Sequence, residues 1–350
     1  MRLLGGGHNK ARVAQARIPI RPDPAPLARK EVRHLHEGRG EGFEGGDRGG
    51  DKKRRGAQEG GDEVAQAKQY LNSVAFAYKS MNYKVGTLLE KERLTDKIFR
   101  MKLHHPQIAS KVRAGQFILL LMDERSERVP FAVSDWSGED GWIEFAFEVV
   151  GYSTRRLSEV EPGYGFLNVA GPLGNPVEVE GGIDVCVVAE GIGISEAYAV
   201  ARAFREAGCA VRSVLGADRE SELFYLDKVG SVSDEVFLCT KDGKWIPERL
   251  REVMEAKRPD LVYTVGKVET MKAVSELTKE LGVRTLASLR PIMLCGIGIC
   301  GSCRVKVGGK IRLTCLDGPS FDAHQIDFDE LLARMGMFRE EERVVSEVMK

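Results

Sequence analysis

Residues 295 to 315 read CGIGICGSCRVKVGGKIRLTC, and the rest of the chain is best interpreted outward from this stretch. Three cysteines fall on one short glycine-rich loop, and a fourth follows a segment with Gly308-Gly309 at its centre, which predicts a hairpin. The spacing is C-x4-C-x2-C-x11-C, formed by Cys295, Cys300, Cys303 and Cys315. A loop and a hairpin that bring four thiolates together predict a metal site made of sulfur ligands.

The spacing of the first three cysteines matches the plant-type [2Fe-2S] pattern. Gly296, Gly298 and Gly301 would let the backbone adopt positive φ and point its amides at a negatively charged cluster. A structural zinc site is the alternative, although zinc knuckles usually pair two C-x2-C motifs. A disulfide pair is less favoured, because nothing in the sequence marks a secreted chain. The sequence therefore predicts that the four cysteines hold a [2Fe-2S] cluster.

The composition excludes several classes of protein. The 52 basic and 52 acidic residues cancel, so no general attraction to nucleic acid or to an anionic membrane is expected. The longest apolar run, residues 117–122, is too short to cross a bilayer and is typical of a buried strand. Seven cysteines without a secretory signal indicate a reducing compartment, so we expect a cytoplasmic protein. Three isolated cysteines are expected to pack as small hydrophobes: Cys186, Cys209 and Cys239.

A chain of 350 residues predicts two or three domains. Residues 37–63 are dense in glycine and charge and poor in branched apolar side chains, so they cannot offset their ordering entropy. Residues 63–80 could form a short helix. We expect residues 1–80 to be a disordered or spurious N-terminal extension, with translation beginning at Met81. A nucleic-acid-binding arm is the alternative, but acidic residues interrupt the basic ones, and Phe43 is the one aromatic residue within residues 1–62.

Residues 81–180 predict a small antiparallel β-barrel, because short apolar stretches are separated by closely spaced turn residues. Three features of this segment indicate a possible binding or chemical role. Residues 128–134, RVPFAVS, place a cation and a hydroxyl just after an apolar strand. Residues 151–155 open a short helix whose first amides and hydroxyls form an anion site, and residues 171–174 make a tight turn. Each alone is more often an ordinary loop, but their joint occurrence favours a function.

Residues 181–287 predict a parallel nucleotide-binding α/β domain, because five apolar strands alternate with helical stretches. The first strand leads into the loop EGIGIS at residues 190–195 and then into a helix. Its glycines allow a tight turn, and the helix N-terminus can meet a pyrophosphate. Residues 264–271 repeat the strand–glycine–helix arrangement. Residues 288–350 then form the cluster subdomain and end in a helix from about Asp327.

The order of barrel, nucleotide domain and cysteine loop resembles the ferredoxin–NADP reductase superfamily. Within it, the chain is similar to electron-transfer subunits of dihydroorotate dehydrogenase B and to small (alpha) subunits of NADH-dependent reduced ferredoxin:NADP oxidoreductase, also called sulfide dehydrogenase. Besides the cysteine loop, residues 288–293 (SLRPIM) and 317–329 (DGPSFDAHQIDFD) carry this similarity. The implied fold is α/β plus β: an antiparallel flavin-binding barrel, a parallel NAD(P)-binding domain and a small [2Fe-2S] subdomain.

The resemblance also implies binding residues, position by position. For FAD these are Arg128, Pro130, Ser134, Gly151, Ser153, Thr154 and Gly171. For NAD(P)H they are Gly191, Gly193, Ser195, Gly266 and Met271. The four cysteines of the loop and hairpin would hold the [2Fe-2S] cluster.

Two residues depart from the pattern of these families. Cys295 stands where the ferredoxin:NADP small subunits often carry an aspartate, so the all-cysteine set resembles the dihydroorotate dehydrogenase and hydrogenase subunits more. Glu190 stands where a glycine is usual in the nucleotide loop. Its charge would disfavour the close approach of a pyrophosphate at that point.

The resemblance implies a subunit of an NAD(P)H-dependent flavoprotein oxidoreductase. It would pass electrons through FAD and [2Fe-2S] to a larger oxidoreductase subunit, with ferredoxin as a further partner and with neither nucleic acid nor a membrane. No catalytic side chain is implied, since the cofactors carry the chemistry. His104 and His105, beside Pro106, are expected at the surface.

Three other functions stay open at this stage. The chain could serve dihydroorotate dehydrogenase B or a sulfhydrogenase as their electron-transfer subunit, or it could act as a flavin reductase without a partner. A different class is a zinc-stabilised nucleic-acid-binding protein.

Overall fold

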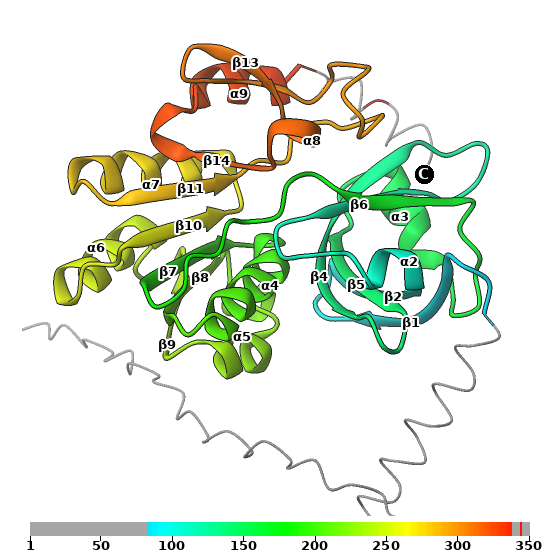
Figure 1. The fold of residues 1–350 in the computed structure, drawn as a ribbon, viewed down its shortest axis with the longest axis horizontal. Coiled ribbons are helices and arrows are strands. Elements are labelled where there is room, and N and C mark those ends of the chain that lie inside the picture. The colour runs from blue at the N-terminus through cyan, green and yellow to red at the C-terminus, as the bar shows by residue number, and fades with distance from the viewer. Residues whose placement is uncertain (1–82, 338–343, 345–350) are drawn as a thin grey trace, which may run out of the picture. The chain divides into compact units, whose positions relative to one another are not determined.

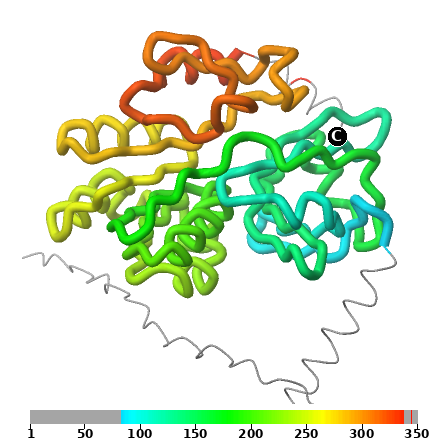
Figure 2. The backbone as a smooth tube through the Cα atoms, viewed as in Figure 1, coloured from blue at the N-terminus to red at the C-terminus, as the bar shows by residue number. Residues whose placement is uncertain are grey.

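A computed structural model of the chain describes residues 83–337 and residue 344 (Figure 1). The expected N-terminal extension and the proposed start at Met81 lie outside the described residues. From residue 83 onward the chain forms an antiparallel barrel, a parallel α/β sheet and a C-terminal part with the cysteine loop (Figures 1 and 2). This order confirms the predicted fold class.

The barrel is built from six antiparallel strands in the order β1-β2-β5-β4-β3-β6. Their bounds are β1 Thr87–Arg93, β2 Ile98–His104, β3 Phe117–Leu121, β4 Arg128–Ser137, β5 Trp142–Glu148 and β6 Asn168–Leu173. The sheet closes on itself because the Leu88 N–H donates to the Tyr164 carbonyl at 2.8 Å. Alternate side chains of these strands point inward, and Met101, Phe145 and Phe147 form part of the resulting core.

Two histidines correct an expectation about the barrel. His104 and His105 are 7% and 9% exposed, whereas the sequence suggested surface positions. Pro106 is the first residue of a short helix, α2 (Pro106–Ala109), and His105 caps it by accepting the Ile108 N–H at Nδ1, 3.3 Å away. Burial lowers the pKa of both imidazoles. Proline is well tolerated in the first turn of a helix, so Pro106 begins α2 and the two histidines before it lie in the barrel core instead of at the surface.

A second sheet carries the predicted nucleotide domain, in the strand order β14-β11-β10-β7-β8-β9. Its strands are β7 Asp184–Glu190, β8 Ala210–Ala217, β9 Glu235–Thr240, β10 Leu261–Val265, β11 Arg284–Ser288 and β14 Ser320–Asp322. The first five pair in parallel, as their apolar runs predicted. β14 comes from beyond the cysteine loop and pairs antiparallel with β11, so it attaches the C-terminal part to this sheet.

Helices cover both faces of the parallel sheet (Figure 1). They are α4 Gly193–Glu206, α5 Leu226–Val232, α6 Ile246–Ala256 and α7 Val268–Glu280. Along β7, Val185 and Val187 pack with α4 on one face, while Cys186 and Val188 pack with α6 and α7 on the other. Burial raises the pKa of the Cys186 thiol to about 12. This cysteine packs as a small hydrophobe, as expected, and Cys209 and Cys239 are buried in the same way.

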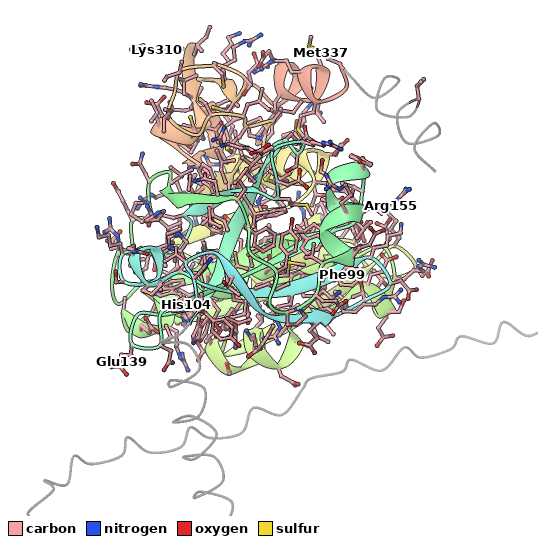
Figure 3. All side chains as sticks on the ribbon, turned by 90° about the vertical axis from the view of Figure 1, so that its right-hand side faces the viewer. Phe99, His104, Glu139, Arg155, Lys310 and Met337 are labelled. Atoms are coloured by element: carbon pink, nitrogen blue, oxygen red, sulfur yellow. The ribbon has the colours of Figure 1, made fainter. Side chains whose placement is uncertain are left out.

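The C-terminal part consists of short elements. They are a hairpin of β12 Arg304–Val307 and β13 Lys310–Leu313, followed by α8 Thr314–Asp317 and α9 Phe328–Met335. The Asp327 carboxylate caps α9 by accepting the Glu330 N–H at 3.1 Å, which confirms the predicted start of that helix. Figure 3 labels Lys310 in the hairpin and Met337 just beyond α9, and both side chains are exposed.

A buried polar network joins the barrel to the nucleotide domain. The carboxylate of Glu144, on β5, accepts from Arg100 Nη1 at 2.7 Å within the barrel. From the other domain it accepts from Tyr225 Oη at 2.8 Å and from Lys228 Nζ, on α5, at 2.6 Å. Lys228 also lies 3.2 Å from Asp135 Oδ2 on β4. Burial, with the Glu144 charge beside it, raises the pKa of Tyr225, so this hydroxyl keeps its donor proton at neutral pH.

Across residues 83–337, no helix is both long enough and apolar enough to span a membrane.

Candidate functional site

The four predicted ligands converge in two pairs of sulfur atoms. Cys303 and Cys315 are both 2% exposed, and their Sγ atoms lie 3.3 Å apart. In the other pair, the Cys300 N–H donates to Cys295 Sγ at 3.4 Å, and the Cys300 side chain is exposed. The β12–β13 hairpin returns the chain to the loop and delivers Cys315, as the sequence predicted.

The loop glycines have the backbone geometry that the sequence predicted. Gly296, Gly298 and Gly301 have φ values of +71°, +76° and +67°. A Cβ on Gly296 would also lie 2.7 Å from Leu119 Cδ1, on the barrel strand β3. Any side chain at this position would therefore be strained and would separate the cysteine loop from the barrel.

A two-iron cluster fits this arrangement better than a single zinc ion. One zinc ion needs three or four ligands gathered around one point. Within residues 83–337, no group of three or more Cys, His, Asp or Glu side chains is placed to do this. Two separate sulfur pairs suit a binuclear cluster, in which each iron takes two cysteine sulfurs. All seven cysteines are free thiols, so the disulfide alternative finds no support either.

One sulfur of each pair has a shifted acidity. A hydrogen bond with the Ser302 hydroxyl, 3.1 Å from Cys300 Sγ, is the main cause that lowers the pKa of Cys300 to about 6. Burial is the main cause that raises the pKa of Cys315 to about 12. Because metal ligands bind as thiolates, Cys300 is ready for a metal, whereas Cys315 needs the metal charge to ionise.

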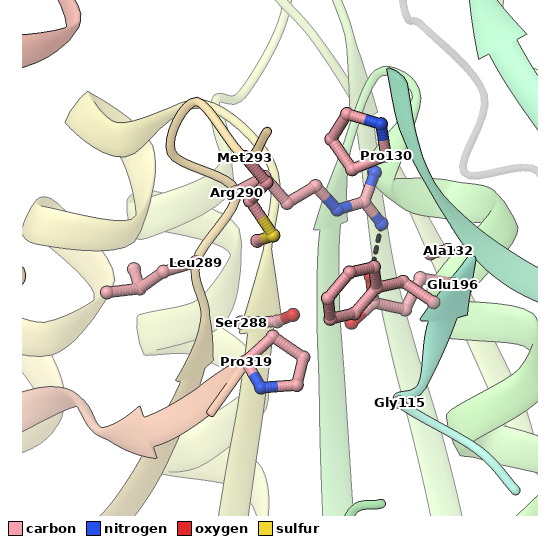
Figure 4. A pocket seen from close by; sticks show the side chains of 10 residues that line it. Gly115, Pro130, Ala132, Glu196, Ser288, Leu289, Arg290, Met293 and Pro319 are labelled. Carbon is pink, nitrogen blue, oxygen red and sulfur yellow. Dashed lines mark hydrogen bonds and ion pairs between the residues drawn. The ribbon is translucent and has the colours of Figure 1, made fainter. Parts of the chain in front are cut away.

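A small pocket that opens to solvent lies beside the buried pair (Figure 4). Two of its walls, Phe117 and Met293, belong to the same apolar cluster as Cys303 and Cys315. The pocket brings together the barrel, the nucleotide domain and the start of the cysteine loop. Its lining consists of Gly115, Phe117, Pro130, Ala132, Glu196, Ser288, Leu289, Arg290, Met293 and Pro319.

The flavin residues implied on β4 fall in different places. Pro130 lines the pocket, and Arg128 is exposed at the start of the strand. Ser134 is fully buried, and its hydroxyl donates to the Glu144 carbonyl at 3.2 Å, so we now assign it a structural role inside the barrel. A Cβ on Gly171 would lie 2.9 Å from a methyl carbon of β3, so close packing also accounts for this glycine.

The predicted helix after Gly151 is present as α3, Tyr152–Glu159. No atom would approach a Cβ on Gly151 within 4 Å, so the backbone is open on that side. Thr154 Oγ1 accepts the Gly151 N–H at 3.1 Å and therefore caps the helix. The exposed Ser153 hydroxyl donates to Glu127 Oε1 at 2.6 Å. The open backbone and the first amides of α3 remain a candidate phosphate site, whereas the Thr154 hydroxyl is already engaged.

The glycines of the nucleotide loop serve two purposes. Gly191 has a φ of +55° and an open surrounding, so its backbone can approach a ligand. A Cβ on Gly193 would lie 2.7 Å from the Val265 carbonyl oxygen, so this glycine lets α4 pack against β10. Gly266 has a φ of +150° and lies equally close to Glu190. Crowding and backbone conformation together account for glycine at these positions.

The two other residues implied for NAD(P)H lie below the surface. The Ser195 hydroxyl donates to the Ile192 carbonyl at 2.9 Å within the first turn of α4. The Met271 side chain is buried in the core between α7, β11 and α9. Ser195 therefore contributes to the local structure of the helix and Met271 to core packing, and their contact with NAD(P)H stays a prediction.

Glu190 is neutralised by an ion pair. Its carboxylate is buried, and Lys267 Nζ lies 2.8 Å from Oε1 and 2.9 Å from Asp218 Oδ1. Burial alone would lower the pKa of Lys267, but the two carboxylates outweigh it and raise this pKa. The negative charge of Glu190, which was expected to disfavour a pyrophosphate, is therefore buried and balanced by Lys267.

The sequence alone gave no indication of the polar residues that line the pocket. These are Glu196, Ser288 and Arg290. Ser288 and Arg290 lie within the segment SLRPIM that carries the family resemblance, but nothing in it shows that they meet Glu196.

Comparisons with known proteins agree with this geometry. Residues 290–327 match the family model for the iron-sulfur cluster binding domain of dihydroorotate dehydrogenase B. The chain is 36% identical over 265 residues to a dihydroorotate dehydrogenase B (NAD(+)) electron transfer subunit homolog from Thermotoga maritima, covering 74% of this chain and 94% of that protein. It is 26% identical over 251 residues to the dihydroorotate dehydrogenase B (NAD(+)) electron transfer subunit of Clostridium perfringens, covering 71% and 100%.

Solved structures extend the similarity to three dimensions. A chain from the structure of NADH-dependent reduced ferredoxin-NADP oxidoreductase, solved in a study of flavin-based electron bifurcation, is 34% identical, with a TM-score of 0.71. The match covers 77% of this chain and 99% of that chain. Phthalate dioxygenase reductase shares the fold at 17% identity, with a TM-score of 0.52 over 65% of this chain and 88% of that one.

Proposed function

The chain belongs to the family of dihydroorotate dehydrogenase B electron-transfer subunits, and on this basis we propose that it passes electrons from NAD(P)H through FAD and a [2Fe-2S] cluster to a larger partner subunit. One observation carries the proposal. The buried pair Cys303 and Cys315 shares Phe117 and Met293 with the wall of the pocket, so a flavin ring in the pocket and a cluster on the cysteines would be direct neighbours.

The bound cofactors would supply the redox chemistry, and the residues of the chain would bind and orient them. Pro130 and Ala132 would hold the flavin ring against β4. The first amides of α3 would bind the FAD phosphates, and the loop around Gly191 would receive the nicotinamide nucleotide. The apolar wall between the pocket and the buried sulfur pair would exclude water. No side chain needs to act as an acid, a base or a nucleophile.

Anaerobic titration of the full chain with NADH tests this function. We expect the isolated protein to contain flavin and about two irons, and stoichiometric NADH to bleach the absorption bands of both. The assignment is wrong if the protein contains zinc instead of iron, or if NADH leaves the flavin oxidised.

Asp218 favours NADH over NADPH. It follows β8, the strand beside the one that carries the glycine loop, where an acidic residue can accept from the adenosine ribose in dinucleotide-binding domains. Hydrogen bonds from Lys241 and Lys267 lower the pKa of Asp218, so it is charged at neutral pH and would repel a 2′-phosphate.

We therefore expect Asp218→Ser to shift the ratio of kcat/KM values toward NADPH by about tenfold. Steady-state flavin reduction with both nucleotides measures this ratio, and Asp242→Ser, at an exposed carboxylate that follows the neighbouring strand β9, is the control. A wild-type preference for NADPH would contradict the argument, and would indicate that Lys241 and Lys267 turn from Asp218 to the phosphate.

A larger oxidoreductase subunit in the cytoplasm is the proposed electron acceptor. The relatives are named as electron transfer subunits, which by their names serve another protein. Three exposed apolar side chains lie in or next to the cysteine motif and would suit a protein contact: Ile297, Ile299 and Leu316. Purification from the native cell under anaerobic conditions should recover the partner in a stoichiometric complex, whereas full activity of the isolated chain would indicate an independent flavin reductase.

A further inference from the structure

The pocket holds two opposite charges that have no part in the function proposed above. Arg290 and Glu196 are the charged residues among the ten that line it, and they form an ion pair with each other (Figure 4). The Arg290 side chain is 33% exposed, whereas that of Glu196 is 2% exposed. The Arg290 guanidinium can therefore contact a ligand in the pocket, and the buried Glu196 carboxylate fixes its position.

The carboxylate is itself fixed in place. Tyr263 Oη donates to Glu196 Oε1 at 2.6 Å, and Tyr263 is fully buried on β10. Burial, with the Glu196 charge beside it, raises the pKa of Tyr263, so the tyrosine remains a donor at neutral pH. One carboxylate oxygen thus meets the tyrosine and the other meets Arg290, which leaves the guanidinium little freedom.

Ser288 adds a third polar side chain to the pocket wall. Its hydroxyl is buried and faces the Tyr263 hydroxyl, so it belongs to the same polar group as Glu196 and Arg290. The ring system of a flavin carries polar atoms on one edge and is apolar on the other, which suits this mixed lining.

We propose that the Glu196–Arg290 pair sets the reduction potential of the flavin in this pocket, with Arg290 raising it and Glu196 lowering it. This inference rests on the proposed function. A flavin ring that takes up two electrons and one proton carries one negative charge. A neighbouring cation stabilises that charge and a neighbouring carboxylate destabilises it, and both effects are strong where water is excluded.

The test compares flavin midpoint potentials, measured by anaerobic reductive titration of the full chain against reference dyes. Arg290→Gln removes the cation and should lower the potential. Glu196→Gln keeps the shape of the side chain, removes the carboxylate charge and should raise the potential. Arg290→Lys keeps the charge and should stay close to the wild type. The double variant restores charge balance, so its potential should lie between those of the two single variants.

Opposite shifts are the decisive result, because a purely structural role of the pair would not produce them. Equal potentials in the wild type and Arg290→Gln, or shifts in the same direction, would overturn the inference. If Glu196→Gln fails to fold, the comparison of Arg290→Gln with Arg290→Lys still decides, because Arg290 is partly exposed and its loss should be tolerated. A wild-type protein that binds no flavin would instead overturn the proposed function.

Discussion

Replacing Cys303 by alanine is expected to remove both irons from the protein while the flavin stays bound. Cys303 is one half of the buried sulfur pair, with its Sγ 3.3 Å from that of Cys315. Without it, one iron keeps a single cysteine ligand, and a binuclear cluster cannot be held by half of one pair. The flavin contacts proposed above lie on β4 and α3, and this change leaves the residues of both elements in place. Iron content should fall from about two atoms per chain to near zero, and the paramagnetic signal of the reduced cluster should disappear.

Cys239→Ala is the matched control for this substitution. Cys239 is as buried as Cys303, and its pKa is raised to about 11 by burial, but it packs in the nucleotide domain, outside the apolar cluster that contains Cys303 and Cys315. Its loss should leave iron content and spectrum unchanged. A Cys303→Ala protein that keeps the spectrum of the wild type would show that the ligand set is wrong.

Replacing Glu144 by alanine should cause the largest loss of stability. The change removes the buried carboxylate that Arg100 and Lys228 share, although Arg100 keeps Glu90 and Glu92 and Lys228 keeps Asp135 as charged partners. Leaving a buried charge uncompensated costs about 3–5 kcal/mol, so with these partners retained we expect a loss of about 3 kcal/mol. The same carboxylate connects β5 to Tyr225 and α5, so the barrel and the nucleotide domain lose a shared contact. We expect the apparent Tm to fall by roughly 10 °C, as measured by circular dichroism at fixed cofactor content.

Glu92→Ala provides the comparison, because Glu92 pairs with the same arginine. Glu92 Oε2 lies 2.9 Å from Arg100 Nε, but the Glu92 side chain is 54% exposed. An exposed pair contributes at most about 1 kcal/mol, so the Tm should change little. Equal effects of the two substitutions would mean that burial of the ion pair is not what stabilises the contact between the domains.

The strands were predictable from the sequence because their apolar runs are continuous or alternate cleanly. The runs AVRSVLGA and EVFLCT are two of the five apolar stretches from which the sequence predicts the parallel domain, and they form β8 (Ala210–Ala217) and β9 (Glu235–Thr240). Buried parallel strands show such runs, and Gly308-Gly309 predicts the hairpin turn from equally local sequence. These features depend on neighbours in sequence, so no knowledge of the tertiary structure was needed.

The pocket could not be predicted, because it depends on contacts between distant segments. Glu196 follows β7 and Arg290 follows β11. In the sheet these two strands are separated by a single strand, β10, so the two side chains meet although they are far apart in sequence. The pairing of β14 with β11 is equally remote in sequence. Met271 shows another limit of the sequence, because the family resemblance implies a contact with NAD(P)H at a position where the side chain is buried in the core.

The unequal burial of the two sulfur pairs has a consequence for oxygen damage. Cys300 is exposed, and its neighbour Ile299 is 80% exposed. Cys303 and Cys315 are buried, because they pack against side chains of the barrel strand β3. Dioxygen and other oxidants must therefore attack from the side of Cys300, so sulfenic acid should form there first. A subunit docked over Ile299 would close this entrance, and the assembled complex should survive in air longer than the separate chain.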